Sequence, residues 1–202
     1  MQRLKLILVD PHAELCAAWK KHFKNLPNVT TVNGRFEELP EFDCMVSAAN
    51  SFGLMDGGVD LAIINFFGID LMDRVQQHII TEYLGEQPVG TSFIVETNNP
   101  QHPFVAHTPT MRVPMPISRT DNVYKGMWAM LVAVHRHNLG SAVKIETIAC
   151  PGLGTLTGRV EPDEAARQMA LAYRHYLWPP DLISWPFAQT RQHAIGRGGD
   201  DN

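Results

Sequence analysis

One stretch of the chain, residues 44–63, constrains the fold more than any other. It reads as a short apolar strand, a small-residue turn that ends at Asn50, a loop that closes on Gly57 and Gly58, and then a helix. The helix is predicted because apolar residues recur there at the three- and four-residue spacing of one buried face. These residues are Val59, Ala62, Ile63 and Phe66. A strand that passes through a glycine loop into a helix is typical of α/β proteins.

The glycine loop predicts a site for a phosphate-bearing ligand. Glycine lacks Cβ and can take positive φ, so Gly57 and Gly58 can expose N–H groups where the helix begins. Unpaired amides and the positive end of the helix dipole attract an anion there. Asn50 can offer its amide to a ligand hydroxyl, and Asp60 lies in the first helical turn. We therefore expect these residues to surround a ligand.

A purely structural interpretation of the same residues stays open. Two glycines before a helix often form only a tight turn. Asn50 can simply turn the chain. An acid in the first helical turn, such as Asp60, interacts favourably with the helix dipole without any ligand.

The segment resembles the first signature of the macrodomain family, whose members bind or hydrolyse ADP-ribose. That signature runs Asn-Ala-Ala-Asn, a glycine run, Val-Asp and Ala-Ile, and residues 48–50, 57–60 and 62–63 fall in the same register. The resemblance implies a three-layer α/β/α sandwich with a mixed, mainly parallel central sheet. It covers residues 1–177, and residues 178–202 are then a C-terminal extension that packs first and is mobile at its end.

A second signature of the family is a proline-led loop rich in Gly, Ser and Thr, after a late strand and before the last large helix. Here a strand-like run over 145–150 leads into the loop 151–158, and a helix opens at Pro162, as helix starts prefer. Taken alone, such a loop is more often a simple turn than a ligand site. The resemblance implies that a diphosphate lies between the two loops.

The resemblance also assigns roles to individual residues. Asn50 orients the distal ribose, and Asp60 positions or deprotonates a water. Asp56, which is unusual for the signature, is a second carboxylate close by and a candidate substitute acid. Loop amides hold the diphosphate and stabilise charge as the bond breaks. The residues expected to bind the ligand are Ser47, Ala49, Gly57, Gly58, Val59, Gly152, Gly154, Thr155, Leu156, Thr157, Gly158, Arg35 and Phe36.

Several positions depart from the family pattern, among them Met55 and Asp56, which replace earlier glycines of the run. Ser47 replaces the first Asn of the signature, and Leu156 stands where glycine is common and narrows the second loop. Residues 34–36, Gly-Arg-Phe, replace a Gly-Asp-Ile stretch whose acid reads the adenine amino group in many members. Arg35 can stack on a base or pair with a phosphate, and Phe36 can stack as well. A surface Arg beside a core Phe is the alternative.

Two functions follow from the resemblance. The first is hydrolysis of ADP-ribose from a protein side chain, or of ADP-ribose 1''-phosphate. The alternative is a non-catalytic binder, a reader or sponge for ADP-ribose or a related signalling nucleotide, which the altered base pocket at Arg35 favours.

A receiver domain is a third interpretation, because residues 6–12 are similar to the start of that fold. A receiver domain needs an aspartate at the end of its third strand, but here Val46 is followed by Ser47, which disfavours this interpretation.

Composition restricts the partners. The chain has 202 residues and a formal net charge of −4, so a nucleic-acid backbone is not an expected partner. Three widely spaced cysteines predict neither a zinc site nor a disulfide framework. No signal peptide or membrane-length apolar run is evident. We expect a cytoplasmic protein of bacterial or phage origin that needs no cofactor and takes ADP-ribose or an ADP-ribosylated protein as its partner.

Histidines do not predict a metal site, because the nine are scattered along the chain. His107 lies at a strand end near the expected cleft, and we expect a half-buried imidazole with a hydrogen-bond partner.

The remaining elements alternate between strand and helix. Strands are predicted over 4–9, 29–32, 43–46, 91–96, 104–108 and 145–150, and helices around 15–26, 58–66, 66–84 with a break near Gly68, 121–138 and 162–176. Residues 109–116 are too rich in proline for a strand interior and are expected to form one rim of the cleft. Trp178, Trp185 and Phe187 are expected to pack an extended tail across the body.

Overall fold

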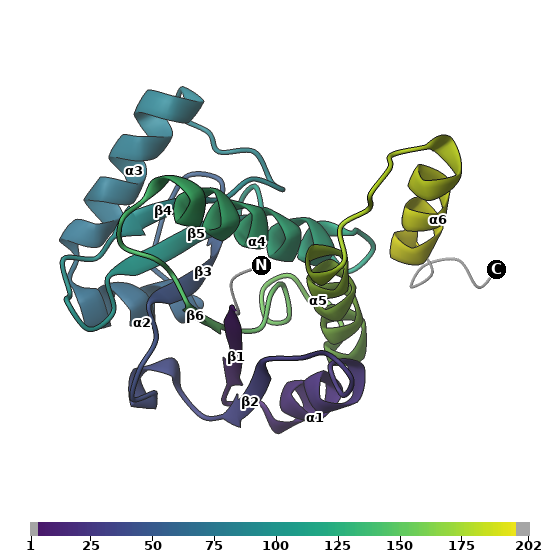
Figure 1. Cartoon of the computed structure of the whole chain (residues 1–202). Helices are drawn as coiled ribbons and strands as arrows, with labels where there is room; N and C mark the ends of the chain where they lie inside the picture. Colours follow the sequence, from purple (N-terminus) through teal and green to yellow (C-terminus); the bar gives the residue numbers. More distant parts are fainter. Residues whose placement is uncertain (1–3, 197–202) are drawn as a thin grey trace.

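The protein folds around a six-stranded sheet that lies between two layers of helices (Figure 1), in a computed structural model that describes residues 4–196. The strands are β1 (Lys5–Asp10), β2 (Val29–Asn33), β3 (Cys44–Asn50), β4 (Phe93–Glu96), β5 (Phe104–Met111) and β6 (Thr147–Cys150). The helices are α1 (Ala13–His22), α2 (Gly58–Phe67), α3 (Asp70–Tyr83), α4 (Asn122–Gly140), α5 (Pro162–Leu177) and α6 (Trp185–Gly196), with a short 3-10 helix, η1 (Phe36–Glu38). The predicted three-layer α/β/α sandwich is confirmed.

The sheet is mixed and mainly parallel. Its strand order is β2-β1-β6-β3-β5-β4, and only β4 runs antiparallel to its neighbour, β5. Because the parallel strands all end at the same edge, the loops after β1, β6, β3 and β5 meet there. In open α/β sheets this edge is where ligands bind.

Alternating side chains of the strands build the two cores. In β1, Leu6 and Leu8 pack in the core under α1, α4 and α5, while Val9 belongs to the core under η1, α2 and α3. In β3, Val46 faces the first core and Met45 the second. This period of two explains why the buried strands read as continuous apolar runs.

Two strands extend three or more residues beyond their predicted ends. β3 continues through the predicted turn to Asn50, and β5 continues through Pro109 to Met111. Pro109 lies beyond the last pair of β4 and β5, which joins Phe93 to His107, so β5 has an unpaired edge on that side at the proline. On the other side the register with β3 shifts by one residue just after Pro109.

The C-terminal segment forms a helix, not the extended tail that the sequence predicts. Residues 185–196 form α6, which Figure 1 shows beyond α5 at the end of a long connection. Trp185 is 81% exposed and Trp178 is 59% exposed, so neither anchors the segment. The end that the sequence predicts to be mobile begins at about Arg191; residues 191–196 instead belong to α6, and the rest of that end lies outside the described residues.

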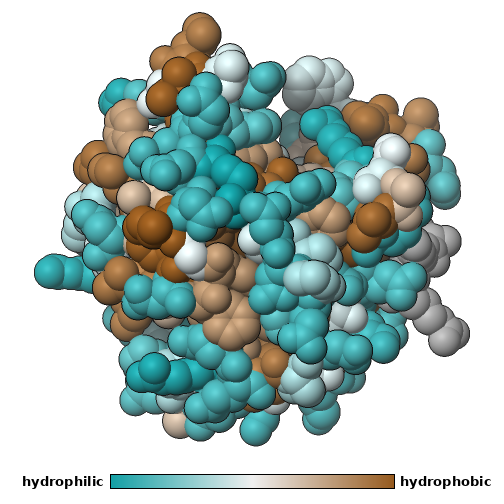
Figure 2. Space-filling view, turned by 90° about the vertical axis from the view of Figure 1, so that its left-hand side faces the viewer, coloured by the Kyte–Doolittle hydropathy of each residue, from teal (hydrophilic) through white to brown (hydrophobic). Residues whose placement is uncertain are grey.

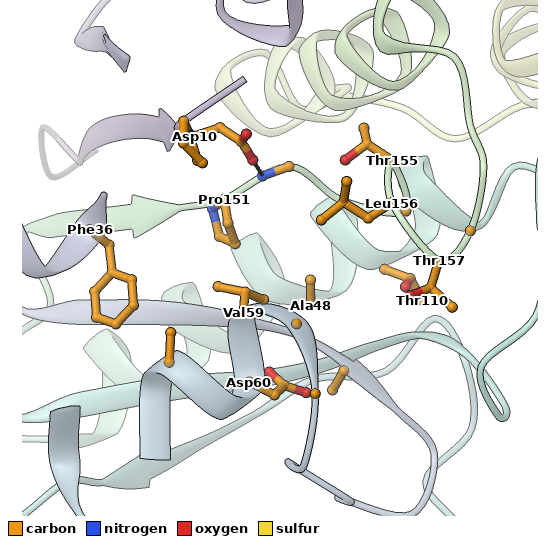
Figure 3. Close-up of a pocket in the computed structure, with 18 of the residues that line it drawn as sticks. Asp10, Phe36, Ala48, Val59, Asp60, Thr110, Pro151, Thr155, Leu156 and Thr157 are labelled. Carbon is orange, nitrogen blue, oxygen red and sulfur yellow. Dashed lines mark hydrogen bonds between the residues drawn. The ribbon is translucent and has the colours of Figure 1, made fainter. Parts of the chain in front are cut away.

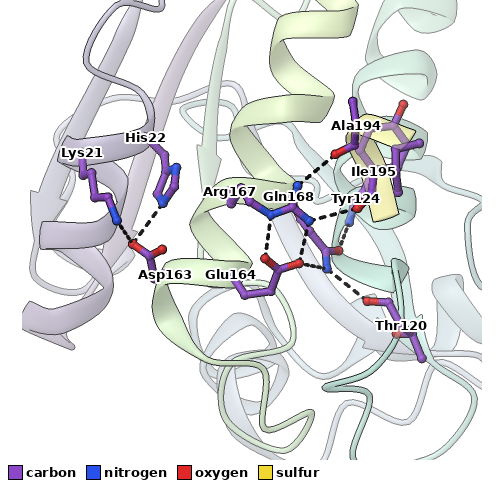
Figure 4. A network of polar contacts seen from close by, with 10 residues as sticks. All are labelled: Lys21, His22, Thr120, Tyr124, Asp163, Glu164, Arg167, Gln168, Ala194 and Ile195. Carbon is purple, nitrogen blue, oxygen red and sulfur yellow. Dashed lines mark hydrogen bonds and ion pairs between the residues drawn. The ribbon is translucent and has the colours of Figure 1, made fainter. Parts of the chain in front are cut away.

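Polar contacts hold α6 to the body (Figure 4). Arg167 of α5 donates hydrogen bonds to the carbonyl oxygens of Ala194 and Ile195, at 3.1 and 3.0 Å, and Glu164 holds the same guanidinium. The Arg191 guanidinium lies 4.4 Å from the centre of the Trp128 ring. A basic side chain at a helix C-terminus satisfies carbonyls that the helix leaves free.

The molecular surface carries no broad apolar area on the face seen in Figure 2, where hydrophobic side chains form small separate patches among hydrophilic ones. Exposed large apolar residues are spread along the chain, most of them in connecting segments, among them Leu54, Ile69, Leu139, Leu156 and Ile183. Within residues 4–196, no helix has the length and apolar character needed to cross a membrane.

Candidate functional site

A cavity of about 420 Å³ lies at the edge of the sheet where the parallel strands end. Its walls come from η1, from the start of α2 and from the segments that follow β1, β3, β5 and β6. The volume is in the range of small-molecule sites. Every predicted site residue except Ser47 lines it: Arg35, Phe36, Ala49, Asn50, Asp56, Gly57, Gly58, Val59, Asp60, Gly152, Gly154, Thr155, Leu156, Thr157 and Gly158.

The first loop brings the start of α2 to the cavity. Gly58 has φ of +57°, a left-handed conformation that favours glycine, whereas Gly57 is extended. No side chain caps this helix end. The first N–H groups of a helix have no partner within it, so those around Val59 are available to an anion in the cavity.

The second loop, residues 151–158, forms the opposite wall (Figure 3). It is held in place by its carbonyls: Val160 N donates to Gly154 O at 3.0 Å, and Ile117 N donates to Gly158 O at 2.7 Å. A Cβ on Gly158 would collide with Gly154 O, so this turn requires glycine. Among the described hydrogen bonds, none uses the N–H groups of residues 154–158 as donors, which leaves them for a ligand.

Asp60 lies in the cavity wall with its carboxyl group almost wholly buried. Asp60 as a whole is 5% exposed, and its Oδ1 accepts a hydrogen bond from Ser47 Oγ at 2.7 Å. Burial raises the pKa of Asp60 to about 6, and the bond from Ser47 opposes that shift only in part. Ser47 is fully buried behind Asp60 and contacts the acid rather than the cavity. The Ser47 hydroxyl therefore forms a hydrogen bond within the protein, and Ser47 does not line the cavity.

Asn50 shapes the first loop. Its Oδ1 accepts hydrogen bonds from the N–H groups of Phe52 and Leu54, at 3.0 and 3.3 Å, and its Nδ2 donates to Leu54 O at 2.7 Å. The side chain therefore turns the chain, although the residue also lines the cavity.

At the other end of the cavity lies an acid that the sequence analysis did not single out as a site residue. Asp10, the last residue of β1, is 8% exposed; its Oδ2 accepts a hydrogen bond from Gly152 N at 3.2 Å, and its Oδ1 one from His12 N at 3.0 Å. Phe36 is buried against Phe42, and Arg35 is exposed at the rim. The sequence signal that could have identified Asp10 is an acidic residue directly after the apolar strand predicted over 4–9.

The charge of the cavity is unusual for an anion site. Four carboxylates line it, at Asp10, Glu37, Asp56 and Asp60, whereas Arg35 is the only Lys or Arg among the described lining residues. A bound phosphate must therefore be held mainly by backbone amides.

His107, predicted to be half-buried near the cleft, is fully buried and lies outside the described lining of the cavity. Its Nδ1 is 2.6 Å from Gln87 Oε1, and burial lowers its pKa to about 3, so the imidazole is neutral. Burial also raises the thiol pKa of Cys44 and Cys150. Within residues 4–196, no cluster of three or more His, Cys, Asp or Glu is arranged to hold a metal ion.

The segment of the chain that contains both loops matches the model of a known protein family. The model of the macro domain matches residues 46–169, more than half of the chain. The chain belongs to the macro domain family. The match includes both loops, so the part of the cavity of this macrodomain that they form lies in the matched segment, whereas the lining residues 9–12, 34–37 and Met45 lie outside it.

Solved macrodomain structures share the fold of this chain, and one curated protein is similar to it in sequence. A mutant macrodomain of Oceanobacillus iheyensis with ADPR superposes with a TM-score of 0.60 at 23% identity, over 82% of this chain and 88% of that chain. The macrodomain of DarG from Mycobacterium tuberculosis gives a TM-score of 0.58 at 18% identity, over 70% and 87%. An uncharacterized protein of Aquifex aeolicus is 29% identical over 149 residues, which are 74% of this chain and 82% of that protein.

Proposed function

We propose that this macrodomain binds ADP-ribose and hydrolyses the bond that joins its distal ribose to a protein side chain or to a phosphate. The binding part is supported by the cavity between two amide-lined loops, and by the ADPR found with a macrodomain of the same fold. The hydrolytic part is supported by one observation, the buried Asp60 carboxyl group with a pKa of about 6 in the cavity wall.

In this reaction Asp60 acts as a general base. Its carboxylate takes a proton from a water as the water oxygen bonds to the anomeric carbon of the distal ribose, and the bond from that carbon to the leaving oxygen breaks. The leaving oxygen is protonated from solvent. A base with a pKa near the working pH is well matched to this task. Amides of the two loops would stabilise the charge that develops.

A non-catalytic reader is the second candidate, and two observations favour it. Both polar atoms of the Asn50 side chain are bonded within the first loop, so they are less free to orient a ribose. The 5% exposure of Asp60 also leaves little room for a water beside its carboxylate. A reader returns its ligand intact, whereas an enzyme consumes it.

The experiment that separates them measures ADP-ribose release from a mono-ADP-ribosylated protein and phosphate release from ADP-ribose 1''-phosphate. We expect turnover of at least one substrate, reduced about 100-fold or more by Asp60→Asn. Asp73→Asn, which removes an exposed acid of α3, is the matched control and should leave the rate unchanged. Asp56→Asn tests the second carboxylate of the rim.

No turnover of either substrate, with ADP-ribose still bound, would leave the reader as the function. We further propose that the protein acts in the cytoplasm on ADP-ribosylated protein. A nucleic-acid backbone is not a proposed partner, because the net charge of −4 provides no basic excess.

A further inference from the structure

One end of the cavity is an apolar slot with a single buried acid. Apolar lining residues at this end come from β1, η1, α2 and the second loop, as Figure 3 shows for Phe36, Val59 and Pro151. Asp10 lines the cavity at the end of β1, with its carboxyl group directed at Gly152 N of the second loop. A flat apolar ring with a polar edge group would satisfy both features.

Asp10 has an acceptor site left for a ligand. An ionised carboxylate has about four acceptor positions. Oδ1 accepts the N–H of His12 and lies 2.7 Å from His12 Nδ1, and Oδ2 accepts only the N–H of Gly152. The second acceptor position of Oδ2 therefore remains for a donor in the cavity. The fixed N–H donors also hold the carboxylate in one orientation, so it can select a donor by position.

The order of strands places Asp10 away from the proposed reaction centre. β1 is separated from β3 by β6, and adjacent strands are about 4.8 Å apart, so Asp10 lies about 10 Å from the end of β3 along the sheet edge. The second loop follows β6 and lies between them. A diphosphate on that loop would direct the distal ribose toward Asn50 and Asp60 and the nucleobase toward Asp10.

The residues of η1 and its N-terminal flank cannot provide this recognition. Arg35 has only donors and Phe36 has no hydrogen-bonding side chain, so neither can accept a hydrogen bond from an amino group. Glu37 also lines the cavity, but it is partly exposed and has no N–H donors that fix its orientation among the described hydrogen bonds.

We propose that Asp10 is the residue that determines base specificity in this macrodomain, by accepting a hydrogen bond from the exocyclic amino group of the ligand's base. The proposal rests on the proposed binding of ADP-ribose. It assigns base recognition to the first strand of this chain, and not to residues 34–36. The apolar slot binds the ring, and Asp10 rejects a base that presents a carbonyl oxygen in place of the amino group.

The test compares ADP-ribose with its inosine analogue, in which hypoxanthine replaces adenine, by calorimetric titration of the full chain. The wild type should bind ADP-ribose about tenfold or more tightly than the analogue, because the carbonyl of hypoxanthine would face the Asp10 carboxylate unpaired. In Asp10→Asn the amide can donate to that carbonyl, so the preference should disappear or reverse. Glu37→Gln removes the same charge from the same cavity and should keep the wild-type preference.

The outcomes separate this proposal from the proposed function. If the wild type binds both ligands equally, or if Glu37→Gln changes the ratio and Asp10→Asn does not, base recognition by Asp10 is wrong while binding of ADP-ribose stands. If the wild type binds neither ligand, the proposed function fails and this inference fails with it. Should Asp10→Asn not fold, the wild-type ratio still decides, because equal binding excludes a base-reading carboxylate.

Discussion

At the scale of single residues, the proposed function requires Asp60 to be charged, whereas the stability of the fold favours a neutral Asp60. Its carboxyl group is buried at the start of α2, where Ser47 is its hydrogen-bond donor. Burial raises its pKa from 3.8 to about 6, so the folded protein binds this proton more tightly than the unfolded chain does. The charged form that the proposed hydrolysis needs is therefore the form that destabilises the fold.

This opposition predicts a pH-dependent gain in stability for Asp60→Asn. Below pH 3.8 the acid is protonated in both states and costs nothing. As pH rises from about 4 to about 6 the wild type loses stability, and above pH 6 the loss is complete. We expect Asp60→Asn to raise the free energy of unfolding by about 1–3 kcal/mol at pH 8 and by almost nothing at pH 4. Urea unfolding at the two pH values measures this difference, and a destabilised variant at pH 8 would contradict it.

The turnover of the wild type should follow the same titration with the opposite consequence. A general base must be ionised, so the rate should fall tenfold per pH unit below about pH 6, where Asp60 becomes protonated. A pH profile of ADP-ribose release under saturating substrate measures it. A rate that is flat between pH 5 and pH 7 would exclude Asp60 as the base.

At the scale of elements, the second loop depends on the absence of a side chain at one position. A Cβ on Gly158 would collide with Gly154 O and lie 2.8 Å from Ile117 Cγ1, whereas a Cβ on Gly57 would meet nothing within 4 Å. We expect Gly158→Ala to lower the free energy of unfolding by about 1–3 kcal/mol and to weaken ADP-ribose binding, because the loop must move. Gly57→Ala is the control, with its stability within about 0.5 kcal/mol of the wild type. Equal melting temperatures for the two variants would show that the loop is not so constrained.

Helix α6 is expected to be independent of the cavity. We propose that residues 178–202 form an extension to a domain over 1–177, since none of the described residues that line the cavity lies in α6. Arg191→Ala removes the contact with the Trp128 ring and a 3.1 Å hydrogen bond to Tyr124 Oη. Hydrogen exchange in α6 should then accelerate while the affinity for ADP-ribose stays within about twofold. Arg174→Ala, on the exposed face of α5, is the matched control; a loss of affinity in Arg191→Ala would show that the extension supports the site.

Elements differ in how far the sequence predicts them. The break between α2 and α3 near Gly68 and the start of α5 at Pro162 are confirmed, because glycine and proline act locally. The extent of β5 through Pro109 was not predictable, because it depends on where β4 stops pairing. Likewise, α6 is held by contacts with residues far away in the sequence, such as Arg167.

At the scale of the whole molecule, the sheet brings together segments that lie about a hundred residues apart. The predicted first and second loops both line one cavity because β3 and β6 are neighbours in a parallel sheet. That prediction was made from two local sequence motifs, the two glycine-containing loops. The place of Asp10 beside Gly152 depends instead on β1 lying next to β6, and no local pattern around Asp10 encodes this neighbour.

The central claim is that this cavity binds ADP-ribose, and calorimetric titration of the full chain with ADP-ribose tests it most directly. Gly57→Glu places a carboxylate at the mouth of the first loop, where the backbone is extended and a Cβ meets nothing, so the variant should fold and lose binding by about 100-fold or more. Gly140→Glu, at the end of α4 and equally open, is the control. The account predicts saturable one-to-one binding to the wild type and to Gly140→Glu. It would be contradicted by no binding to the wild type, or by unchanged binding to Gly57→Glu.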